Sequence, residues 1–163
     1  MPYQILVDVA LPEEFPKMID GRCELHILDH GNVTEKQFEQ ADGLLTYGHM
    51  IIDDAFMDRM PKIKVISNFG VGVDHIDLEA ALQRGISVGN TPSMLDGATA
   101  DMTFALLMTA ARNIVMGDRF ARSPKFTHYD PRILIGYEIH GTTLGIIGMG
   151  NIGRQVARRA QGF

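Results

Sequence analysis

Short apolar segments alternate with amphipathic segments along residues 1–90. The apolar segments are rich in branched residues, as buried strands of parallel sheets are. They predict strands at residues 3–9, 23–28, 43–48, 63–70 and 86–90. The amphipathic segments predict helices after Pro12, after Thr34 as N-cap, at 53–60 and at 77–85. This alternation predicts an α/β fold with a flavodoxin-like, doubly wound parallel sheet, whose strand order the sequence leaves open.

The pattern changes after Pro92, where residues 97–122 predict one long helix. Phe104 and Leu107 lie on one face of that helix, while Leu106 lies on another. A helix that is apolar on more than one face is expected to be buried between domains or between subunits. A segment rich in loop-forming residues follows the helix.

The segment TLGIIGMGNIGRQVARRAQGF reads as a strand at 143–147, a glycine-rich turn and the start of a helix. Gly148, Gly150 and Gly153 form the pattern Gly-x-Gly-x-x-Gly. In dinucleotide-binding proteins the first glycine allows the tight turn, the second admits the pyrophosphate and the third allows close packing of helix on strand. The backbone N–H groups at the helix start then meet the phosphates. The alternative is a glycine-rich turn that binds nothing.

The acidic residue that holds the ribose is expected about 20 residues further on, and the sequence has only ten residues after Gly153.

Composition narrows the class of protein. The chain has 163 residues, 45% of them hydrophobic, and a net charge of −5 spread along its length. No apolar run has the length of a membrane span, and the N-terminus does not have the pattern of a secretory signal. Cys23 is the only cysteine, so no intrachain disulfide is possible. We therefore expect a cytoplasmic protein that acts on a small molecule.

Two other classes of ligand have little support in the sequence. The basic residues Arg154, Arg158 and Arg159 have helical spacing, which a solvated helix face explains, so nucleic-acid binding is not favoured. No cluster of histidine, cysteine and acidic residues has the spacing of metal ligands.

Three segments together resemble the D-isomer-specific 2-hydroxyacid dehydrogenases, in particular the branch of glyoxylate and hydroxypyruvate reductases. The segments are SNFGVGVDHIDLEAALQRGISVGNTP, ATADMTFALLMTAAR and GYEIHGTTLGIIGMGNIGRQVARRAQGF. They occur in the order and spacing of that family, and the resemblance runs from about residue 63 to Phe163. It covers only the N-terminal half of the family's pattern.

The resemblance implies a particular organisation of domains. In this family a substrate-binding domain is built from both ends of the chain, and a nucleotide-binding domain is inserted between them. Residues 1–95 would be the N-terminal part of the substrate-binding domain. Residues 96–163 would begin the NAD(P)-binding domain with the long helix, a loop and the first β–α unit. The resemblance also implies a homodimer that forms through the helix near residues 99–120.

The resemblance implies a substrate site at Val71 and Gly72, whose backbone amides would hold the carboxylate of a small 2-keto or 2-hydroxy acid. This position fits the general rule that ligands of doubly wound sheets bind beyond the carboxyl ends of the strands. An ordinary tight strand–helix turn is the alternative. Tyr47 and Gly48 follow the third predicted strand and are weaker candidates to line the pocket.

For the cofactor, NAD or NADP, the resemblance implies contacts from Thr103 and from the glycine turn. The main-chain amides of Asn151 and Ile152 would contact the pyrophosphate beside Gly148, Gly150 and Gly153. For Thr103 the alternative is a hydroxyl group that bonds back to its own helix.

The family's chemistry uses an arginine, a glutamate and a histidine, and the resemblance places all three beyond residue 163. No catalytic residue is therefore assigned in this chain. His75, His128 and His140 do not match the catalytic position, and Arg112 is interpreted as structural.

The predicted function is that of the N-terminal portion of an NAD(P)-dependent oxidoreductase, inactive or nearly so by itself. If the chain ends at Phe163, apolar surface is expected to be exposed on the side of Met149 and Ala157. One alternative is a catalytically inactive dinucleotide-binding or interaction protein derived from the same family. Another is a response-regulator-like domain, for which Asp8 is available but strand three lacks the second acidic residue.

Overall fold

The computed structural model describes residues 1–163 except residues 20, 29–32 and 48–49. The chain divides into two compact units, Met1–Pro92 and Ser93–Phe163. Among the described residues, none of the helices is long and apolar enough to cross a membrane. The assignment of residues 1–95 to substrate binding and of residues 96–163 to nucleotide binding stays a prediction.

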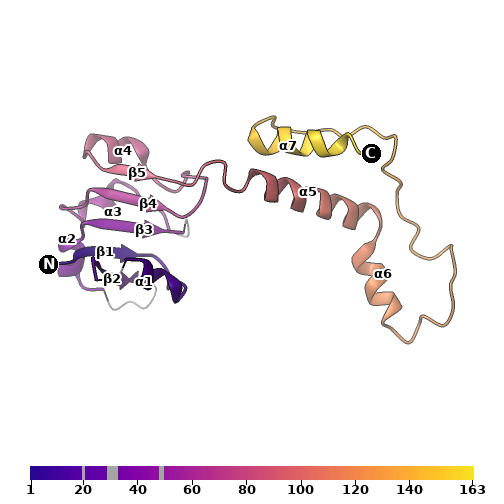
Figure 1. The fold of residues 1–163 in the computed structure, drawn as a ribbon, viewed down its shortest axis with the longest axis horizontal. Coiled ribbons are helices and arrows are strands. Elements are labelled where there is room, and N and C mark those ends of the chain that lie inside the picture. Colours follow the sequence, from indigo (N-terminus) through magenta and orange to yellow (C-terminus); the bar gives the residue numbers. More distant parts are fainter. Residues whose placement is uncertain (20, 29–32, 48–49) are drawn as a thin grey trace. The chain divides into compact units, whose positions relative to one another are not determined.

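The first unit is built on a parallel sheet of five strands, drawn in Figure 1. The strands are β1 (Tyr3–Val7), β2 (Cys23–Ile27), β3 (Gly43–Thr46), β4 (Val65–Asn68) and β5 (Ser87–Gly89). Their order in the sheet is β2-β1-β3-β4-β5, which is the flavodoxin-like order. The predicted α/β fold with its doubly wound parallel sheet is thus confirmed.

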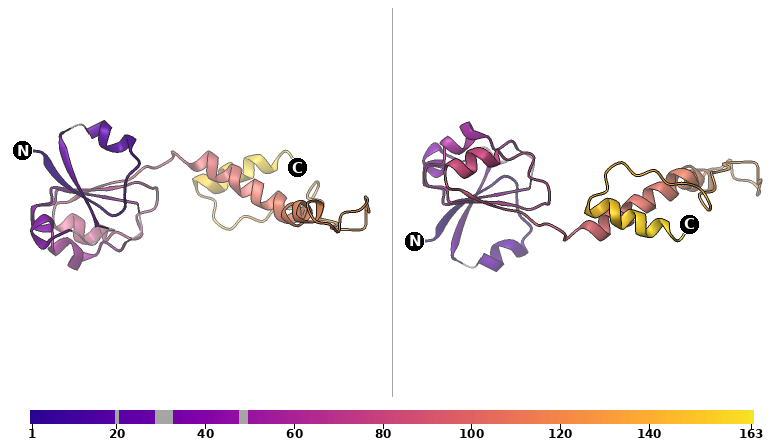
Figure 2. Two further views of the ribbon diagram at one scale, coloured as in Figure 1. Left: turned by 90° about the horizontal axis from the view of Figure 1, so that it is seen from below. Right: turned by 90° about the horizontal axis from the view of Figure 1, so that it is seen from above.

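Four short helices connect these strands: α1 (Glu14–Ile19), α2 (Glu35–Gln40), α3 (Asp54–Asp58) and α4 (Leu78–Gln83). In Figure 2, α1 lies on one face of the sheet, and α2, α3 and α4 lie on the other. The predicted N-cap of α2 is confirmed, because Thr34 and Gln37 form a reciprocal capping box.

The main core lies between the sheet and helices α2–α4. Leu6, Leu44 and Ile66 occupy one row across β1, β3 and β4, and all three are essentially inaccessible to solvent. Phe38, Met57 and Ala81 contribute to the same cluster from the three helices. Because side chains alternate along a strand, Val65 points to the opposite face, where it is 41% exposed.

The second unit has three helices: α5 (Asp96–Ala111), α6 (Ile114–Ala121) and α7 (Asn151–Ala160). The prediction of one long helix over 97–122 is wrong, because the helix breaks between Ala111 and Ile114. Asn113 adopts the left-handed conformation with φ 52°, which asparagine tolerates better than most residues. The side-chain amide of Asn113 donates a hydrogen bond to the carbonyl of Ile135 at 3.2 Å. The N–H of Tyr137 donates to the carbonyl of Ala111 at 2.7 Å. These contacts hold the break.

The strand predicted at 143–147 is absent from the described structure. A strand is defined by hydrogen bonds to a neighbouring strand, and the second unit contains no other strand among its described residues. The helix predicted after the glycine turn does form, as α7, and it packs on α5. Arg159 of α7 bonds Asp101 at 2.6 Å and the carbonyl of Gly97 at 3.1 Å. The rings of Phe104 and Phe163 also stack, with centroids 5.5 Å apart.

Candidate functional site

The loop after β4 is held by hydrogen bonds to its carbonyl groups. Asn68, the last residue of β4, donates from Nδ2 to the carbonyl oxygens of Gly70 at 3.1 Å and Gly72 at 2.8 Å. Asn90 follows β5 and donates from its own Nδ2 to the carbonyl of Val71 at 2.8 Å. The carbonyls of three consecutive residues are therefore all bonded within the first unit.

This arrangement determines where the N–H groups of the loop point. In a planar trans peptide group the N–H points away from the C=O of the preceding residue. Holding the carbonyls of Gly70 and Val71 therefore turns the N–H groups of Val71 and Gly72 away from those bonds. Among the described residues, none accepts a hydrogen bond from these two N–H groups. Val71 and Gly72 are both exposed, so the loop can offer two backbone donors to a carboxylate.

Aromatic side chains lie beside this loop at the carboxyl edge of the sheet. The rings of Tyr47 and Phe69 have centroids 4.8 Å apart, and Phe15 meets Phe69 edge to face at 6.2 Å. Phe69 is 53% exposed. Tyr47 thus adjoins the candidate loop, whereas Gly48, the other weaker candidate, lies outside the described residues.

Asp8 is buried at the end of β1, with 7% of its surface exposed. Its Oδ2 accepts hydrogen bonds from the hydroxyl of Thr46 and the N–H of Tyr47, both at 2.7 Å. A buried carboxylate with these contacts acts as an internal acceptor, which does not favour the response-regulator-like alternative. Within the described parts of the chain, no group of three or more histidine, cysteine or acidic residues could hold a metal ion.

The glycine turn before α7 has the geometry that its sequence pattern predicts. Gly148 has φ +90°, a conformation that side chains strongly disfavour. A Cβ atom at Gly153 would collide with the carbonyl oxygen of Gly148, whereas one at Gly150 would meet no described atom within 4 Å. The third glycine thus allows the turn to pack on α7, and the second leaves open space in front of the backbone. Binding of a pyrophosphate at this turn stays a prediction.

The N-terminus of α7 differs from those of α2–α4. Thr34, Asp53 and Asp77 cap those three helices with side-chain oxygens. In α7 the N-cap is Gly150, no side chain among the described residues caps the helix, and its first turn has no acidic residue. The positive end of the helix dipole is therefore left without a carboxylate. Asn151 and Ile152 provide the first N–H groups of this helix.

The side chain of Asn151 contacts Arg154, whose Nη2 donates to its Oδ1 at 2.6 Å. A contact from the main-chain amide of Asn151 to a phosphate stays a prediction. Thr103 behaves as its alternative interpretation predicts, because its hydroxyl donates to the carbonyl of Thr99 at 2.8 Å. A contact from Thr103 to the cofactor stays a prediction.

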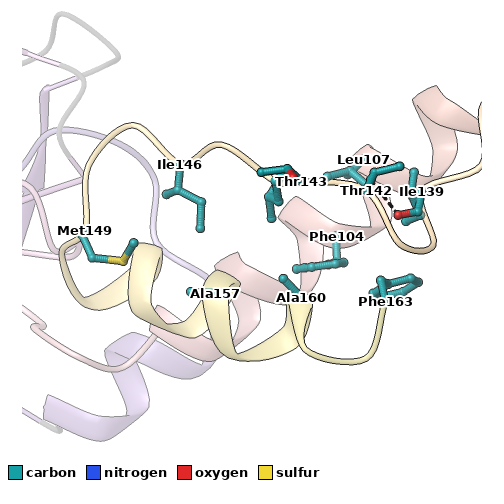
Figure 3. Close-up of a pocket in the computed structure, with 11 residues that line it drawn as sticks. Phe104, Leu107, Ile139, Thr142, Thr143, Ile146, Met149, Ala157, Ala160 and Phe163 are labelled. Atoms are coloured by element: carbon teal, nitrogen blue, oxygen red, sulfur yellow. Dashed lines mark hydrogen bonds between the residues drawn. The ribbon is translucent and has the colours of Figure 1, made fainter.

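An apolar groove of about 660 Å³ lies between α5, α7 and the segment that precedes the glycine turn, as Figure 3 shows. Its lining includes Phe104, Leu107, Ile146, Met149, Ala157 and Phe163. Met149 and Ala157, the two residues named in the conditional prediction of an apolar surface, both line this groove. The side chains that line the groove are mainly apolar, whereas the turn that precedes α7 presents backbone groups.

The three histidines considered from the sequence show no catalytic arrangement among the described residues. The Nε2 atom of His75 is buried without a hydrogen-bond partner there, and Nδ1 of His128 lies 3.0 Å from the hydroxyl of its neighbour Thr127. His140 and Arg112 are exposed. Asn68 and Asn90 were not predicted as part of the site. An asparagine at the end of a strand, beside a loop with two glycines, is the signal that could have identified Asn68.

Comparison with known proteins gives a consistent result. Residues 5–158 match the family described as D-isomer specific 2-hydroxyacid dehydrogenase, catalytic domain. A glyoxylate reductase of Pyrococcus horikoshii is 38% identical over an alignment of 172 residues, which covers 100% of this chain and 52% of the relative.

Solved structures show the same similarity. A crystal structure of a Thermus thermophilus protein matches with a TM-score of 0.85 and 41% identity, over 97% of this chain and 52% of that one. An NADPH-dependent glyoxylate/hydroxypyruvate reductase of Sinorhizobium meliloti, in complex with NADP and malonate, matches with a TM-score of 0.84 and 27% identity. That match covers 99% of this chain and 51% of the reductase. The chain therefore spans about half the length of each of these proteins.

Proposed function

Because the chain belongs to the D-isomer specific 2-hydroxyacid dehydrogenase family, we propose that it is the N-terminal portion of an NAD(P)-dependent oxidoreductase. The whole enzyme would transfer a hydride between the nicotinamide cofactor and a small 2-keto or 2-hydroxy acid. The observation that carries this proposal is the loop at Val71 and Gly72, which presents two backbone N–H donors at the carboxyl edge of the sheet. Glyoxylate and hydroxypyruvate are the substrates that the relatives' names suggest.

In this proposal the loop binds the carboxylate of the substrate. Two adjacent backbone N–H groups can donate to a carboxylate, and hydrogen bonds to a charged acceptor are stronger than those to a neutral one. The exposed aromatic ring of Phe69, with Tyr47 packed against it, would border the rest of a small substrate.

The glycine turn would hold the cofactor through its pyrophosphate. Gly148, Gly150 and Gly153 supply the shape of the turn, and the N–H groups of Asn151 and Ile152 would donate to phosphate oxygens. The bound nicotinamide supplies the hydride acceptor or donor. The pyrophosphate that these groups would hold is common to NAD and NADP.

The complete reaction also needs a proton to be delivered to, or removed from, the substrate oxygen. In reduction, a hydride adds to the carbonyl carbon and a proton to the carbonyl oxygen, so that the keto acid becomes a hydroxy acid. We assign no catalytic residue within 1–163, and the arginine, glutamate and histidine of the family would lie beyond Phe163. The 163-residue chain is therefore expected to have no turnover by itself.

Two measurements test this function. The first is binding of NADH or NADPH to the purified chain, followed by the fluorescence of the nicotinamide. The second is oxidation of NADH by glyoxylate, compared between the 163-residue chain and a chain extended with the codons that follow Phe163 in the gene. Turnover by the extended chain alone supports the proposal. If NADH binds but neither chain turns over, the inactive dinucleotide-binding alternative is supported instead, and absence of NADH binding in both chains contradicts both.

We also propose that two copies associate through α5. Met102 and Leu106 of this helix are 59% and 62% exposed, whereas the apolar face that includes Leu106 is expected to be buried between domains or subunits. Exposed apolar side chains grouped on one helix favour association, and a two-fold dimer is the commonest arrangement of identical subunits.

A further inference from the structure

We propose that Asn68 is a positioning residue for the carboxylate site, which it controls by fixing the carbonyl groups of Gly70 and Gly72. This inference rests on the proposed function, because it assumes that the N–H groups of Val71 and Gly72 bind a carboxylate. It concerns a side chain that does not itself face the substrate. Asn68 lies inside the first unit, with 2% of its surface exposed.

The side chain of Asn68 is oriented by its own contacts. An amide group has one NH2 with two hydrogens and one oxygen that only accepts. The NH2 group donates both hydrogens, one to the carbonyl of Gly70 and one to the carbonyl of Gly72. The opposite orientation would bring three oxygen acceptors together. The Oδ1 atom is buried and has no partner among the described residues.

The two residues that Asn68 holds are the two most adaptable residues of the loop. Glycine has wide freedom of φ and ψ, and Gly70 and Gly72 lie on either side of Val71. Without an anchor, rotation at either glycine would turn the N–H groups away from a common acceptor. By bonding both carbonyls from one point, Asn68 restrains both ends of this short segment.

The anchors of the loop are not equivalent. The carbonyl of Gly70 also accepts from the N–H of Thr91 at 3.0 Å, and the carbonyl of Val71 is held by Asn90. For the carbonyl of Gly72, Asn68 is the only donor among the described residues. Loss of Asn68 is therefore expected to free the Gly72 end of the loop most.

The test uses the 15N-labelled 163-residue chain and two variants of Asn68. Asn68→Leu removes the donor without adding charge, and Asn68→Asp keeps the shape but replaces the NH2 group with an oxygen. Gln83→Leu and Gln83→Glu are the matched controls, because they make the same changes at an exposed amide on α4. Unchanged amide resonances of Leu6 and Ile66 would show that the core of a variant is intact.

The first readout is the backbone order of Val71, Gly72 and Val73 from 15N relaxation without ligand. The second is the dissociation constant of glyoxylate, from the shifts of the Val71 and Gly72 amides. For both Asn68 variants we expect lower order at Gly72 and Val73 than at Val71, and at least tenfold weaker glyoxylate binding. The Gln83 controls are expected to stay within twofold of the parent chain.

The outcomes separate this inference from the function on which it rests. If the parent chain shows no glyoxylate-dependent shifts at Val71 and Gly72, the proposed carboxylate site fails, and the assignment of Asn68 to that site falls with it. If the parent binds glyoxylate but a folded Asn68→Leu chain binds equally well with an ordered loop, only the role of Asn68 is overturned. If one Asn68 variant does not fold, the other decides. If neither folds, Asn68 stabilises the unit as a whole, and its assignment as a positioning residue is overturned.

Discussion

The hydroxyl group of Thr46 donates a 2.7 Å hydrogen bond to Oδ2 of Asp8, and both residues are buried in the first unit. The N–H of Tyr47 donates to the same oxygen at 2.7 Å. One carboxylate oxygen thus joins the end of β1 to the end of β3, next to the ring that packs on Phe69.

Removing this acceptor should destabilise the first unit. We expect Asp8→Ala to lower the free energy of unfolding by about 1–3 kcal/mol, because it removes the oxygen that accepts the hydrogen bonds from Thr46 and Tyr47. Asp8→Asn keeps one oxygen and should cost less. The measurement is urea unfolding followed by circular dichroism, with Glu39→Ala as the control for loss of an exposed carboxylate. Equal stability of the Asp8→Ala and Glu39→Ala chains would refute the role of Asp8.

The glycines of the turn should respond differently to the same substitution. Gly150→Ala adds a methyl group in open space, so we expect a normal circular dichroism spectrum but at least tenfold weaker binding of NADH. Gly153→Ala should perturb the fold of the second unit as well, because its methyl group meets the carbonyl of Gly148. Gly145→Ala, also in open space, is the control. Unaltered NADH binding by Gly150→Ala would contradict a pyrophosphate at this position.

The break between α5 and α6 depends on the backbone conformation of Asn113. We expect Asn113→Val to destabilise the second unit by about 1–2 kcal/mol, the approximate cost of a left-handed conformation for an ordinary residue. Asn113→Gly should cost less, because glycine adopts this conformation readily. Thermal unfolding of the two variants, followed by circular dichroism, distinguishes them. Equal loss in both would mean that the side-chain bond to Ile135, and not the backbone, holds the break.

Association through α5 can be tested by placing a charge on its exposed surface. We expect Leu106→Glu to shift sedimentation velocity profiles towards the monomer, because a carboxylate would be buried unpaired in the interface. Leu82→Glu is the matched control, since Leu82 is an exposed leucine of α4 with 79% of its surface accessible. A parent chain that is monomeric at all concentrations, or equal effects of the two variants, would rule out this interface.

Arg132 should influence the titration of Asp130. Hydrogen bonds from the guanidinium and the backbone N–H of Arg132 hold the pKa of the Asp130 carboxyl below its ordinary value of 3.8. A lowered carboxyl pKa stabilises the folded state above the pKa of the unfolded chain, and this contribution is lost as pH falls through the folded pKa. We expect Arg132→Gln to raise the pKa of Asp130 towards 3.8, as measured by NMR titration of its side-chain carbon. A pKa unchanged by the substitution would show that the ion pair is absent in solution.

The sequence predicted those features that depend on local patterns. Runs of branched apolar residues identified all five strands of the first unit, and Thr34 was correctly predicted as the N-cap of a helix. Features that depend on distant partners were missed. The break at Asn113 involves Ile135, 22 positions along the chain. The strand predicted at 143–147 does not form, because the described residues of the second unit provide no strand for it to pair with.

The candidate site shows the same division. Val71 and Gly72 were proposed from the resemblance to the family, and the rule that ligands bind beyond the carboxyl ends of parallel strands agrees with that proposal. The structure adds why their N–H groups are available, which depends on the carbonyls that Asn68 and Asn90 hold. These side-chain hydrogen bonds depend on the path of the loop backbone. The spacing of apolar residues along the sequence does not predict that path.

Recognition by backbone N–H groups has a consequence for how a binding site of this kind can diversify. The backbone N–H is present with every residue except proline at position 71, and the Val71 side chain itself is 41% exposed. Substitutions there can alter the surface next to the ligand while the donors, oriented from inside the domain, keep their direction. In the proposed enzyme, selectivity for the body of the substrate could therefore evolve without loss of affinity for its acid group.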